Sequence, residues 1–299
     1  MDNKNKKIAI IGYGELGRAI HKILENKPGL SIGVWDKKDE IYKLKTVISS
    51  AEIIFLCVPS WCVRDAAKNI ECYLSKNSLI VSLSKGIESE KMKTMDLVLG
   101  ESFNKHQPFG LLSGPMLAEE ISSGKKGFAV FACKNKKYFK FISEIFKGTD
   151  LNIKYSSDLR GVAICGVLKN IYSLGLGICD GLNLGNNTKG VLTSLAIQEM
   201  SEMVVEMGGN KKTVFDDAGM SDFIATAFSS FSRNREVGEK LAKTGICCLE
   251  SEGYKSIYSL VGLLGNKYKK FWFLSALKSI VLDKKDCVGA FSELLNSGI

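Results

Sequence analysis

The stretch KKIAIIGYGELGRAIHKILENK, residues 6 to 27, decides the fold of this chain. It opens with a continuous apolar run between two lysines and a glycine, which is typical of a central parallel strand buried on both faces. Its second half places Leu16, Ile20, Ile23 and Leu24 at helical spacing. The glycine-rich loop GYGELG joins the two parts directly. The stretch therefore predicts a buried strand, a tight turn and an amphipathic helix in immediate succession.

Further strand signals follow at intervals, with helical patterns between several of them. They are SIGVWD (31–36), AEIIFLCVP (51–59), LIVSLSKG (79–86) and FAVFAC (128–133). Strands that alternate with helices favour an α/β fold with a doubly wound parallel sheet. After about residue 155 the strand signals fade and long helical patterns begin, and all four prolines precede residue 116. We expect a sheet domain over 1–155 and an all-helical domain over 156–299.

Composition excludes several classes of protein. The 299 residues carry a formal net charge of +9, but the lysines are dispersed and form no dense basic tract, which argues against a nucleic-acid binder. The nine cysteines include no C-x-x-C pair, and we interpret them as reduced residues of a cytoplasmic protein. The two histidines, His21 and His106, form no ligand-spaced cluster, so no metal site is expected.

No membrane-spanning segment is expected either. The longest apolar stretches are interrupted by Lys169 and Asp180, and no long apolar segment precedes the first strand. We therefore expect no membrane span and no secretory signal.

The glycine loop indicates a dinucleotide site. Gly12 would permit the tight turn, Gly14 would let a pyrophosphate approach the backbone, and Gly17 would let the helix pack close to the sheet. The N-terminus of the helix offers free N–H groups to the phosphates. Asp36, at the end of the second strand, can accept hydrogen bonds from the adenosine ribose and favours NAD. Lys37 and Lys38 follow it and leave NADP open, since they could meet a 2′-phosphate.

A lysine lies within the apolar helical stretch LKNIYSLGLG, residues 168 to 177. Burial disfavours the charged ammonium, so Lys169 either has a structural partner, reaches solvent, or carries a proton in catalysis. His106 lies in a polar loop, and we expect His21 to face away from the chemistry or into the core. A dehydrogenase would then depend on a lysine for proton transfer.

A second constellation lies in GMSDFIATAFSSFSRNR, residues 219 to 235. Asp222 and Thr226 are one helical turn apart, and an aspartate can orient a lysine and stabilise its charge. Arg233 and Asn234 beside the hydroxyl of Ser232 would suit a phosphate, because a guanidinium fork matches phosphate oxygens. A charged helix end in solvent is the alternative interpretation.

Taken together, these segments resemble the NAD(P)-dependent glycerol-3-phosphate dehydrogenases. The most specific matches are the run from Gly166 to Lys189 and the SRNR element, and the resemblance spans residues 8 to about 254. Its segments are IAIIGYGELGRAI, FLCVPS, SLSKGIE, LSGPMLAEEI, GVLKNIYSLGLGICDGLNLGNNTKGVL, GMSDFIAT, SRNREVG and EGY.

The resemblance implies a Rossmann-type nucleotide domain and an enzyme of glycerophospholipid metabolism and phospholipid biosynthesis, a cytoplasmic homodimer. It implies interconversion of dihydroxyacetone phosphate and sn-glycerol 3-phosphate by hydride transfer with NAD(P)H. The implied catalytic residues are Lys169 as acid and base, Lys85 and Asp222. The implied substrate contacts are Lys85, Gly114, Lys169, Asp222, Ser232, Arg233 and Asn234. The implied cofactor contacts are Gly12, Tyr13, Gly14, Glu15, Leu16, Gly17, Asp36, Lys37, Pro59, Lys85, Arg233 and Glu252.

The chain departs from the family pattern at three places. Met116 and Leu117 replace a small polar residue and an aromatic after Gly114–Pro115, Glu250 replaces an apolar residue, and the segment beyond about 255 matches only loosely. These changes leave open a related dehydrogenase acting on another small hydroxy or keto acid. They also leave open a dinucleotide-binding protein without turnover, although two buried lysines argue against it.

Overall fold

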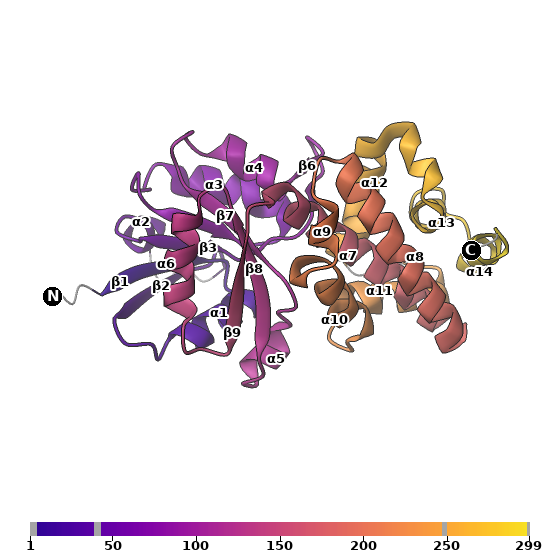
Figure 1. Cartoon of the computed structure of the whole chain (residues 1–299), viewed down its shortest axis with the longest axis horizontal. Helices are drawn as coiled ribbons and strands as arrows, with labels where there is room; N and C mark the ends of the chain where they lie inside the picture. Colours follow the sequence, from indigo (N-terminus) through magenta and orange to yellow (C-terminus); the bar gives the residue numbers. More distant parts are fainter. Residues whose placement is uncertain (1–4, 39–42, 247–249, 298–299) are drawn as a thin grey trace.

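The computed structural model describes residues 5–38, 43–246 and 250–297. A sheet-containing part and a helical part lie side by side, and helix α7 (Leu159–Gly181) runs at their junction (Figure 1). Seven of the nine cysteines are described and all seven are free thiols, while Cys247 and Cys248 lie outside the described residues.

The main sheet has seven strands in the order β2-β1-β3-β4-β7-β8-β9. The chain crosses from one side of β1 to the other between β2 and β3, which creates the switch point where doubly wound sheets bind ligands. The strands are β1 (Lys6–Ile11), β2 (Leu30–Trp35), β3 (Ile53–Leu56), β4 (Leu79–Ser82), β7 (Phe109–Ser113), β8 (Gly127–Cys133) and β9 (Leu151–Ser156).

The predicted doubly wound fold is confirmed, with one difference at the edge of the sheet. Strands β2, β1, β3, β4 and β7 are parallel, but β8 pairs antiparallel with β7, and β9 pairs parallel with β8. The segment between β7 and β8 holds only the short helix α5 (Ala118–Ser122), and β8 returns alongside β7 in the opposite direction. The last two strands therefore run against the other five.

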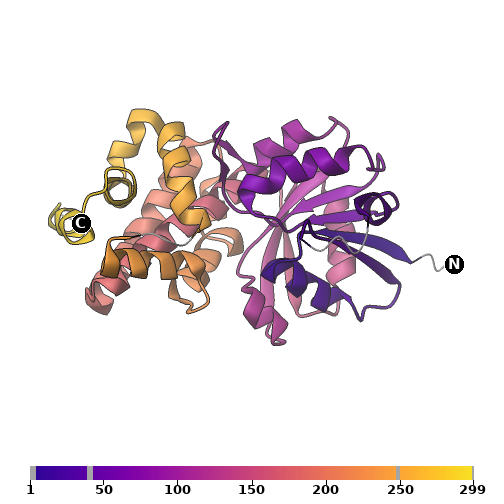
Figure 2. The ribbon, with the colours of Figure 1, turned by 180° about the vertical axis from the view of Figure 1, so that it is seen from behind.

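Helices cover both faces of the sheet (Figure 2). On β1, Ile8 and Ile10 pack on one face, whereas Ala9 and Ile11 pack on the other, which explains the unbroken apolar run. The first face packs against α1 (Glu15–Leu24), α5 and α6 (Lys136–Phe146). The second packs against α2 (Leu44–Ile48), α3 (Val63–Glu71) and α4 (Met95–Ser102). Two short elements complete this part, a 3-10 turn η1 (Ser60–Cys62) and a hairpin of β5 (Ile87–Glu88) and β6 (Lys93–Thr94).

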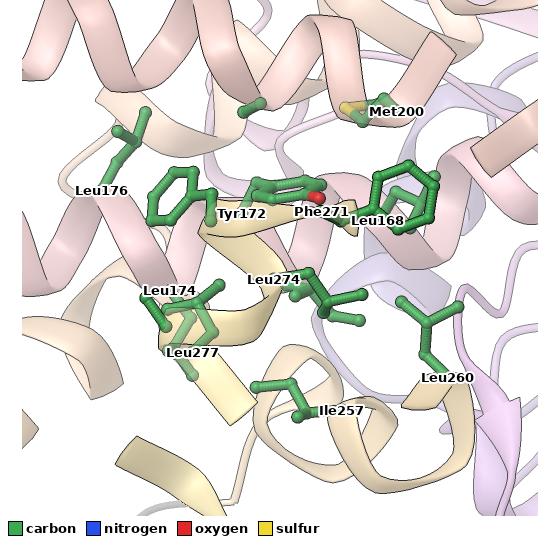
Figure 3. Close-up of a cluster of buried hydrophobic side chains, with 14 of the residues drawn as sticks. Leu168, Tyr172, Leu174, Leu176, Met200, Ile257, Leu260, Phe271, Leu274 and Leu277 are labelled. Carbon is green, nitrogen blue, oxygen red and sulfur yellow. The ribbon is translucent and has the colours of Figure 1, made fainter. Parts of the chain in front are cut away.

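The helical part is built around α7. This helix is apolar on all sides, and 94% of its most apolar 18-residue stretch is buried. It is long and apolar enough to cross a membrane by length and composition alone, but its burial makes it the central helix of a protein core. Figure 3 shows Tyr172 and Leu174 of α7 among side chains of the surrounding helices. Those are α8 (Gly185–Glu206), α9 (Lys211–Val214), the π-turn η2 (Asp217–Ser221), α10 (Asp222–Phe228), α11 (Arg233–Thr244), α12 (Glu252–Leu264), η3 (Gly265–Lys270), α13 (Trp272–Val281) and α14 (Cys287–Asn296).

The two parts share α7. Its first turn contributes Leu159, Val162 and Ala163 to the sheet core, and the rest of the helix belongs to the helical core. The last sheet strand ends at Ser156. The division of the chain at residue 155 stays a prediction.

Candidate functional site

The glycine loop has the geometry of a phosphate-binding turn. Gly12 has φ +91°, a conformation that favours glycine. A Cβ on Gly17 would lie 2.1 Å from the carbonyl oxygen of Gly12, so α1 could not start so close to β1 with any other residue. A Cβ on Gly14, in contrast, would have no atom within 4 Å, and Gly14 is the N-cap of α1. The open backbone at the start of a helix fits the approach of a pyrophosphate.

Alanine substitutions at Gly14 and Gly17 should separate folding from cofactor binding. Gly17→Ala should destabilise the protein by about 1–3 kcal/mol, because the added methyl meets backbone. Gly14→Ala should leave the melting temperature unchanged and weaken NADH binding about tenfold or more, because its methyl occupies the space a phosphate needs. Thermal denaturation and a fluorescence titration with NADH measure both. Equal NADH affinity in wild type and Gly14→Ala would contradict the assignment of the loop.

Asp36 lies at the carboxyl end of β2, next to the glycine loop. Its two oxygens accept the backbone N–H groups of Tyr13 at 2.6 Å and Lys38 at 2.9 Å. These hydrogen bonds lower the pKa of Asp36, so a charged carboxylate is held at the edge where an adenosine ribose would lie. Lys37 and Lys38 are exposed beside it.

One expectation about the loop is corrected. His21 was expected to face away from the chemistry or into the core, but it is only partly buried, and its Nδ1 lies 2.6 Å from Tyr13 Oη. His21 and Tyr13 can meet because the chain turns back at the start of α1. The guanidinium of Arg18 also donates to the Tyr13 carbonyl oxygen at 2.7 Å. Two residues of α1 therefore hold Tyr13: His21 contacts its side chain and Arg18 its backbone.

Lys169 is buried at the middle of α7, with a residual exposure of 8%. Its Nζ donates to Thr226 Oγ1 at 2.9 Å and lies 3.3 Å from Asp222 Oδ1. Asp222 and Thr226 occupy successive turns of α10, so both face the lysine. The ammonium is held by a fixed partner and does not reach bulk water.

Asp222 joins Lys169 to a second lysine from the other part of the protein. Lys85, beyond the end of β4, places its Nζ 2.6 Å from Asp222 Oδ2 and 3.1 Å from the carbonyl oxygen of Gly114. Gly114 lies beyond the end of β7, with φ +150°. The structure therefore brings together four residues from four separate segments: Lys85, Gly114, Lys169 and Asp222.

Burial and neighbouring charges oppose each other at Lys169. Burial lowers its pKa from 10.5 to about 8, the carboxylate of Asp222 acts to raise it, and the charge of Lys85 lowers it. The side chain can therefore gain or lose a proton near neutral pH, as a general acid and base must.

The pH dependence of turnover should follow this titration. A reaction that needs the neutral amine should become faster as pH rises and level off above about pH 8, and the reverse reaction, which needs the ammonium, should slow above that pH. The change should be about tenfold per pH unit on the sloping limb. Initial rates of triose reduction and alcohol oxidation from pH 6 to 10 test this. If the midpoint pH of the limb differed between the two directions, different groups would titrate in them.

The start of α11 forms a third part of the site. Ser232 is its N-cap and accepts the N–H of Arg235, and Arg233 and Asn234 are its first two residues. Asn234 is buried, and its Nδ2 donates to Asn170 Oδ1 at 3.0 Å. Asn170 is the residue that follows Lys169 in α7. Arg233 is exposed, and no carboxylate pairs with it among the described residues. An unpaired guanidinium at a helix N-terminus suits an anion.

The two parts of the protein are linked beside the glycine loop. Glu252, at the start of α12, accepts the backbone N–H of Ser60 at 2.8 Å and also the hydroxyl of Ser60. Ser60 follows Pro59 in the loop after β3. Burial raises the pKa of Glu252, whereas the hydrogen bonds from Ser60 lower it. Glu252 therefore holds the cofactor-side loop against the helical part.

The structure explains two of the departures from the family pattern. Met116 is 8% exposed and packs in the sheet core with Leu112 and Ile121, so an apolar residue suits its surroundings. Glu250 is exposed and pairs with Lys255 at 2.7 Å, and the Lys255 ammonium lies 3.8 Å from the centre of the Trp61 ring. Neither change disturbs the lysine pair or the start of α11.

Three contacts of the site escaped the sequence analysis. Asn170 donates to the Lys85 carbonyl oxygen at 3.1 Å, Ser60 holds Glu252, and the Gly253 N–H donates to Asn234 Oδ1 at 2.8 Å. A polar residue next to Lys169 in an apolar helix was a signal for Asn170. The other two depend on contacts between distant segments. Among the described residues no group of three His, Cys, Asp or Glu could hold a metal ion.

Comparison with known proteins identifies the family. The sequence profile described as NAD-dependent glycerol-3-phosphate dehydrogenase N-terminus matches residues 41–139, and the profile of its C-terminus matches residues 158–292. The glycerol-3-phosphate dehydrogenase (NAD(P)+) of Fusobacterium nucleatum is 34% identical to this chain, and the aligned region covers 78% of this chain and 77% of that enzyme. The enzyme of the same name from Maridesulfovibrio salexigens is 31% identical, with 97% of this chain and 98% of its own length covered.

Solved structures agree on the fold. The glycerol-3-phosphate dehydrogenase of Coxiella burnetii superimposes with a TM-score of 0.89 at 23% identity, over 98% of this chain and 99% of that one. The glycerol-3-phosphate dehydrogenase of Plasmodium falciparum superimposes with a TM-score of 0.85 at 21% identity, over 99% of this chain and 97% of that one. The predicted resemblance is thus confirmed, and the chain belongs to the family of NAD-dependent glycerol-3-phosphate dehydrogenases.

Proposed function

We propose that this chain interconverts dihydroxyacetone phosphate and sn-glycerol 3-phosphate with NAD(P)H. The observation that carries the proposal is the buried Lys169, which Asp222 and Thr226 hold in place. The next residue, Asn170, bonds Asn234 at the start of α11. This arrangement offers a proton carrier and an anion site on adjoining elements. A small phosphorylated carbonyl compound requires both.

The phosphate would lie at the N-terminus of α11. Ser232 caps the helix, Asn234 is fixed by Asn170, and Arg233 extends outward without a carboxylate partner among the described residues. Free N–H groups, the helix dipole and a guanidinium all favour a dianion. Arg233 is also our candidate for a contact to the dinucleotide, because it faces away from the helical core.

Proton transfer would fall to Lys169. In reduction, its ammonium donates a proton to the carbonyl oxygen as hydride reaches the carbon, and in oxidation the amine takes the hydroxyl proton. The nicotinamide, when bound, supplies or accepts the hydride. Lys85 places a second positive charge 2.6 Å from Asp222, where it can stabilise the developing alkoxide, and Gly114 lies beside it. Asp222 keeps both ammonium groups in place.

The cofactor would extend from the glycine loop toward Glu252. Gly12, Tyr13, Gly14, Glu15, Leu16 and Gly17 would surround the pyrophosphate, with Pro59 and Lys85 nearer the nicotinamide. We propose that NAD is preferred over NADP, since the carboxylate of Asp36 would accept the ribose hydroxyl and repel a 2′-phosphate. Lys37 is the residue that could weaken this preference.

We further propose that the protein is a cytoplasmic homodimer joined through its helical part. Large apolar side chains on α8, α10 and the turn after α9 are half exposed, namely Val205, Phe215, Ile224 and Phe228. If these side chains form one contiguous patch in the folded protein, another protein would be expected to cover it. In the reductive direction the enzyme would supply glycerol 3-phosphate for phospholipid synthesis.

An absorbance assay at the nicotinamide band tests the function directly. Dihydroxyacetone phosphate should be reduced with NADH, and more slowly with NADPH. The comparison substrates are 2-keto acids with NADH and 3-hydroxy acids with NAD+, because a related dehydrogenase without a phosphate site would prefer them. Binding of NADH without oxidation of any substrate would instead indicate a nucleotide-binding protein.

Arg233→Ala should chiefly weaken binding of the phosphorylated substrate. The loss of a charge-assisted contact should raise the KM for dihydroxyacetone phosphate by about 10- to 100-fold. Lys240→Ala, which removes another cation of α11 paired with Glu236, is the matched control. Steady-state kinetics at saturating NADH measure both. An unchanged KM in Arg233→Ala would remove the phosphate site from the start of α11.

A further inference from the structure

A partly buried ion cluster lies next to the proposed phosphate site and takes no part in the chemistry described above. Asp180, in the last turn of α7, accepts Arg235 Nε at 2.6 Å and Lys189 Nζ at 2.8 Å. The side chains are 20%, 24% and 10% exposed, respectively. Charges with this little exposure lose part of their hydration, which close and well-aligned partners must offset. The cluster therefore has a role that a solvated surface pair would not have.

The cluster ties together the ends of four helices. Asp180 belongs to α7, Lys189 to the start of α8, and Arg235 to the first turn of α11. The Lys189 ammonium also lies 4.5 Å from the ring centre of Phe228, the last residue of α10. These contacts fix both ends of the turn between α10 and α11. That turn leads directly into Ser232, Arg233 and Asn234.

Helices α7 and α11 touch backbone to backbone. A Cβ on Gly238 would lie 2.0 Å from the Leu174 carbonyl oxygen, and a Cβ on Gly177 would lie 2.1 Å from the Arg235 carbonyl oxygen. Close contact of this kind sets the separation of the helices, but small residues give little resistance to sliding or rotation. Two side-chain hydrogen bonds between the helices provide that resistance. Asn234 bonds Asn170 near Lys169, and the next residue of α11, Arg235, bonds Asp180 near the end of α7.

We propose that Asp180 is a positioning residue for the substrate phosphate. By holding Arg235, it fixes the rotation of the α11 N-terminus, so that Arg233 and Asn234 meet the phosphate while the carbonyl carbon lies near Lys169. Arg235 is itself engaged by Asp180 and by Glu239 at 3.6 Å, and is therefore not a free phosphate ligand as Arg233 is. The inference rests on the proposed function, because it requires a phosphate at this helix end.

Two variants test the inference from opposite sides. Asp180→Asn removes the charge that joins the helices, and Arg235→Gln removes the partner on α11 while the Asp180–Lys189 pair remains. In both, the KM for dihydroxyacetone phosphate and the inhibition constant of inorganic phosphate should rise about tenfold together. The kcat should stay within about twofold and the pH limb near 8, because the contacts of Lys169 are unchanged. Asp283→Asn is the matched control, since Asp283 pairs with Lys278 at 2.8 Å and neither residue belongs to the cluster.

The outcomes separate this inference from the function it rests on. If Arg233→Ala raises the KM and the phosphate inhibition constant but Asp180→Asn and Arg235→Gln do not, the positioning role is wrong and the phosphate site stands. If Arg233→Ala changes neither constant, the proposed phosphate site at the start of α11 fails, and the positioning role fails with it; absence of dihydroxyacetone phosphate reduction by the wild type would instead refute the proposed function. A fall in melting temperature with both constants unchanged would make the cluster purely structural and overturn the inference. Should Asp180→Asn not fold, Arg235→Gln alone decides.

Discussion

Lys169→Ala should lower kcat by about a thousandfold while the affinity for NADH stays within about threefold. The variant removes the proton carrier and one of the two positive charges near the developing alkoxide. It leaves the glycine loop and Asp36 untouched, because among the described residues the polar partners of the Lys169 ammonium are Thr226 and Asp222. Stopped-flow reduction of dihydroxyacetone phosphate and a fluorescence titration with NADH measure the two quantities.

The alanine variant also allows a positive control. The truncated side chain leaves space beside Asp222, and a small primary amine in the buffer could occupy it. Ethylamine should then restore part of the turnover, with a pH dependence that follows the added amine. The variant should remain folded, since Asp222 keeps Lys85 as a partner at 2.6 Å. Turnover close to wild type without added amine would remove Lys169 from the mechanism.

The first strands were predictable because burial on both faces leaves a clear pattern. The apolar run of β1 contributes alternately to the two faces of the sheet, and nothing but a central strand accounts for it. The strands β7 and β9 were missed. LNIKYS (151–156) alternates apolar and polar residues instead of forming the continuous apolar run of the central strands, and FGLLS (109–113) offers only three large apolar residues. The reversal of β8 depends on a connection whose course the local sequence does not specify.

The site likewise has a part that the sequence predicts and a part that it does not. Lys169 was predictable because an ionisable residue in an apolar helix is conspicuous, and the glycine loop because its turn has a fixed spacing. The bridge from Asp222 to Lys85 joins residues 137 positions apart, and that from Ser60 to Glu252 joins residues 192 positions apart. Pattern within one segment carries no information on such contacts. The roles assigned to these residues stay predictions until the variants are measured.

Asp222→Asn should also lower kcat strongly, though less than the loss of Lys169, and its pH signature should differ. Asp222 is the carboxylate that raises the pKa of Lys169 against burial and against the charge of Lys85. Without it, the pKa should fall below about 8, and the pH limb should move at least about one unit toward acid in both directions of the reaction. The kcat near neutral pH should fall by about 100-fold, because the carboxylate no longer holds the two ammonium groups in place.

The direction of that shift is what makes the variant informative. If Asp222 only held the lysines in position, the asparagine variant would lose turnover with its limb still near pH 8. If Asp222 were itself the proton carrier, the limb would disappear. Asp217→Asn, which removes a neighbouring carboxylate paired with Lys154 at 2.8 Å, should leave both turnover and the limb unchanged. A shift toward alkali would contradict the sign of the interaction, because losing a nearby negative charge cannot make a buried ammonium harder to deprotonate.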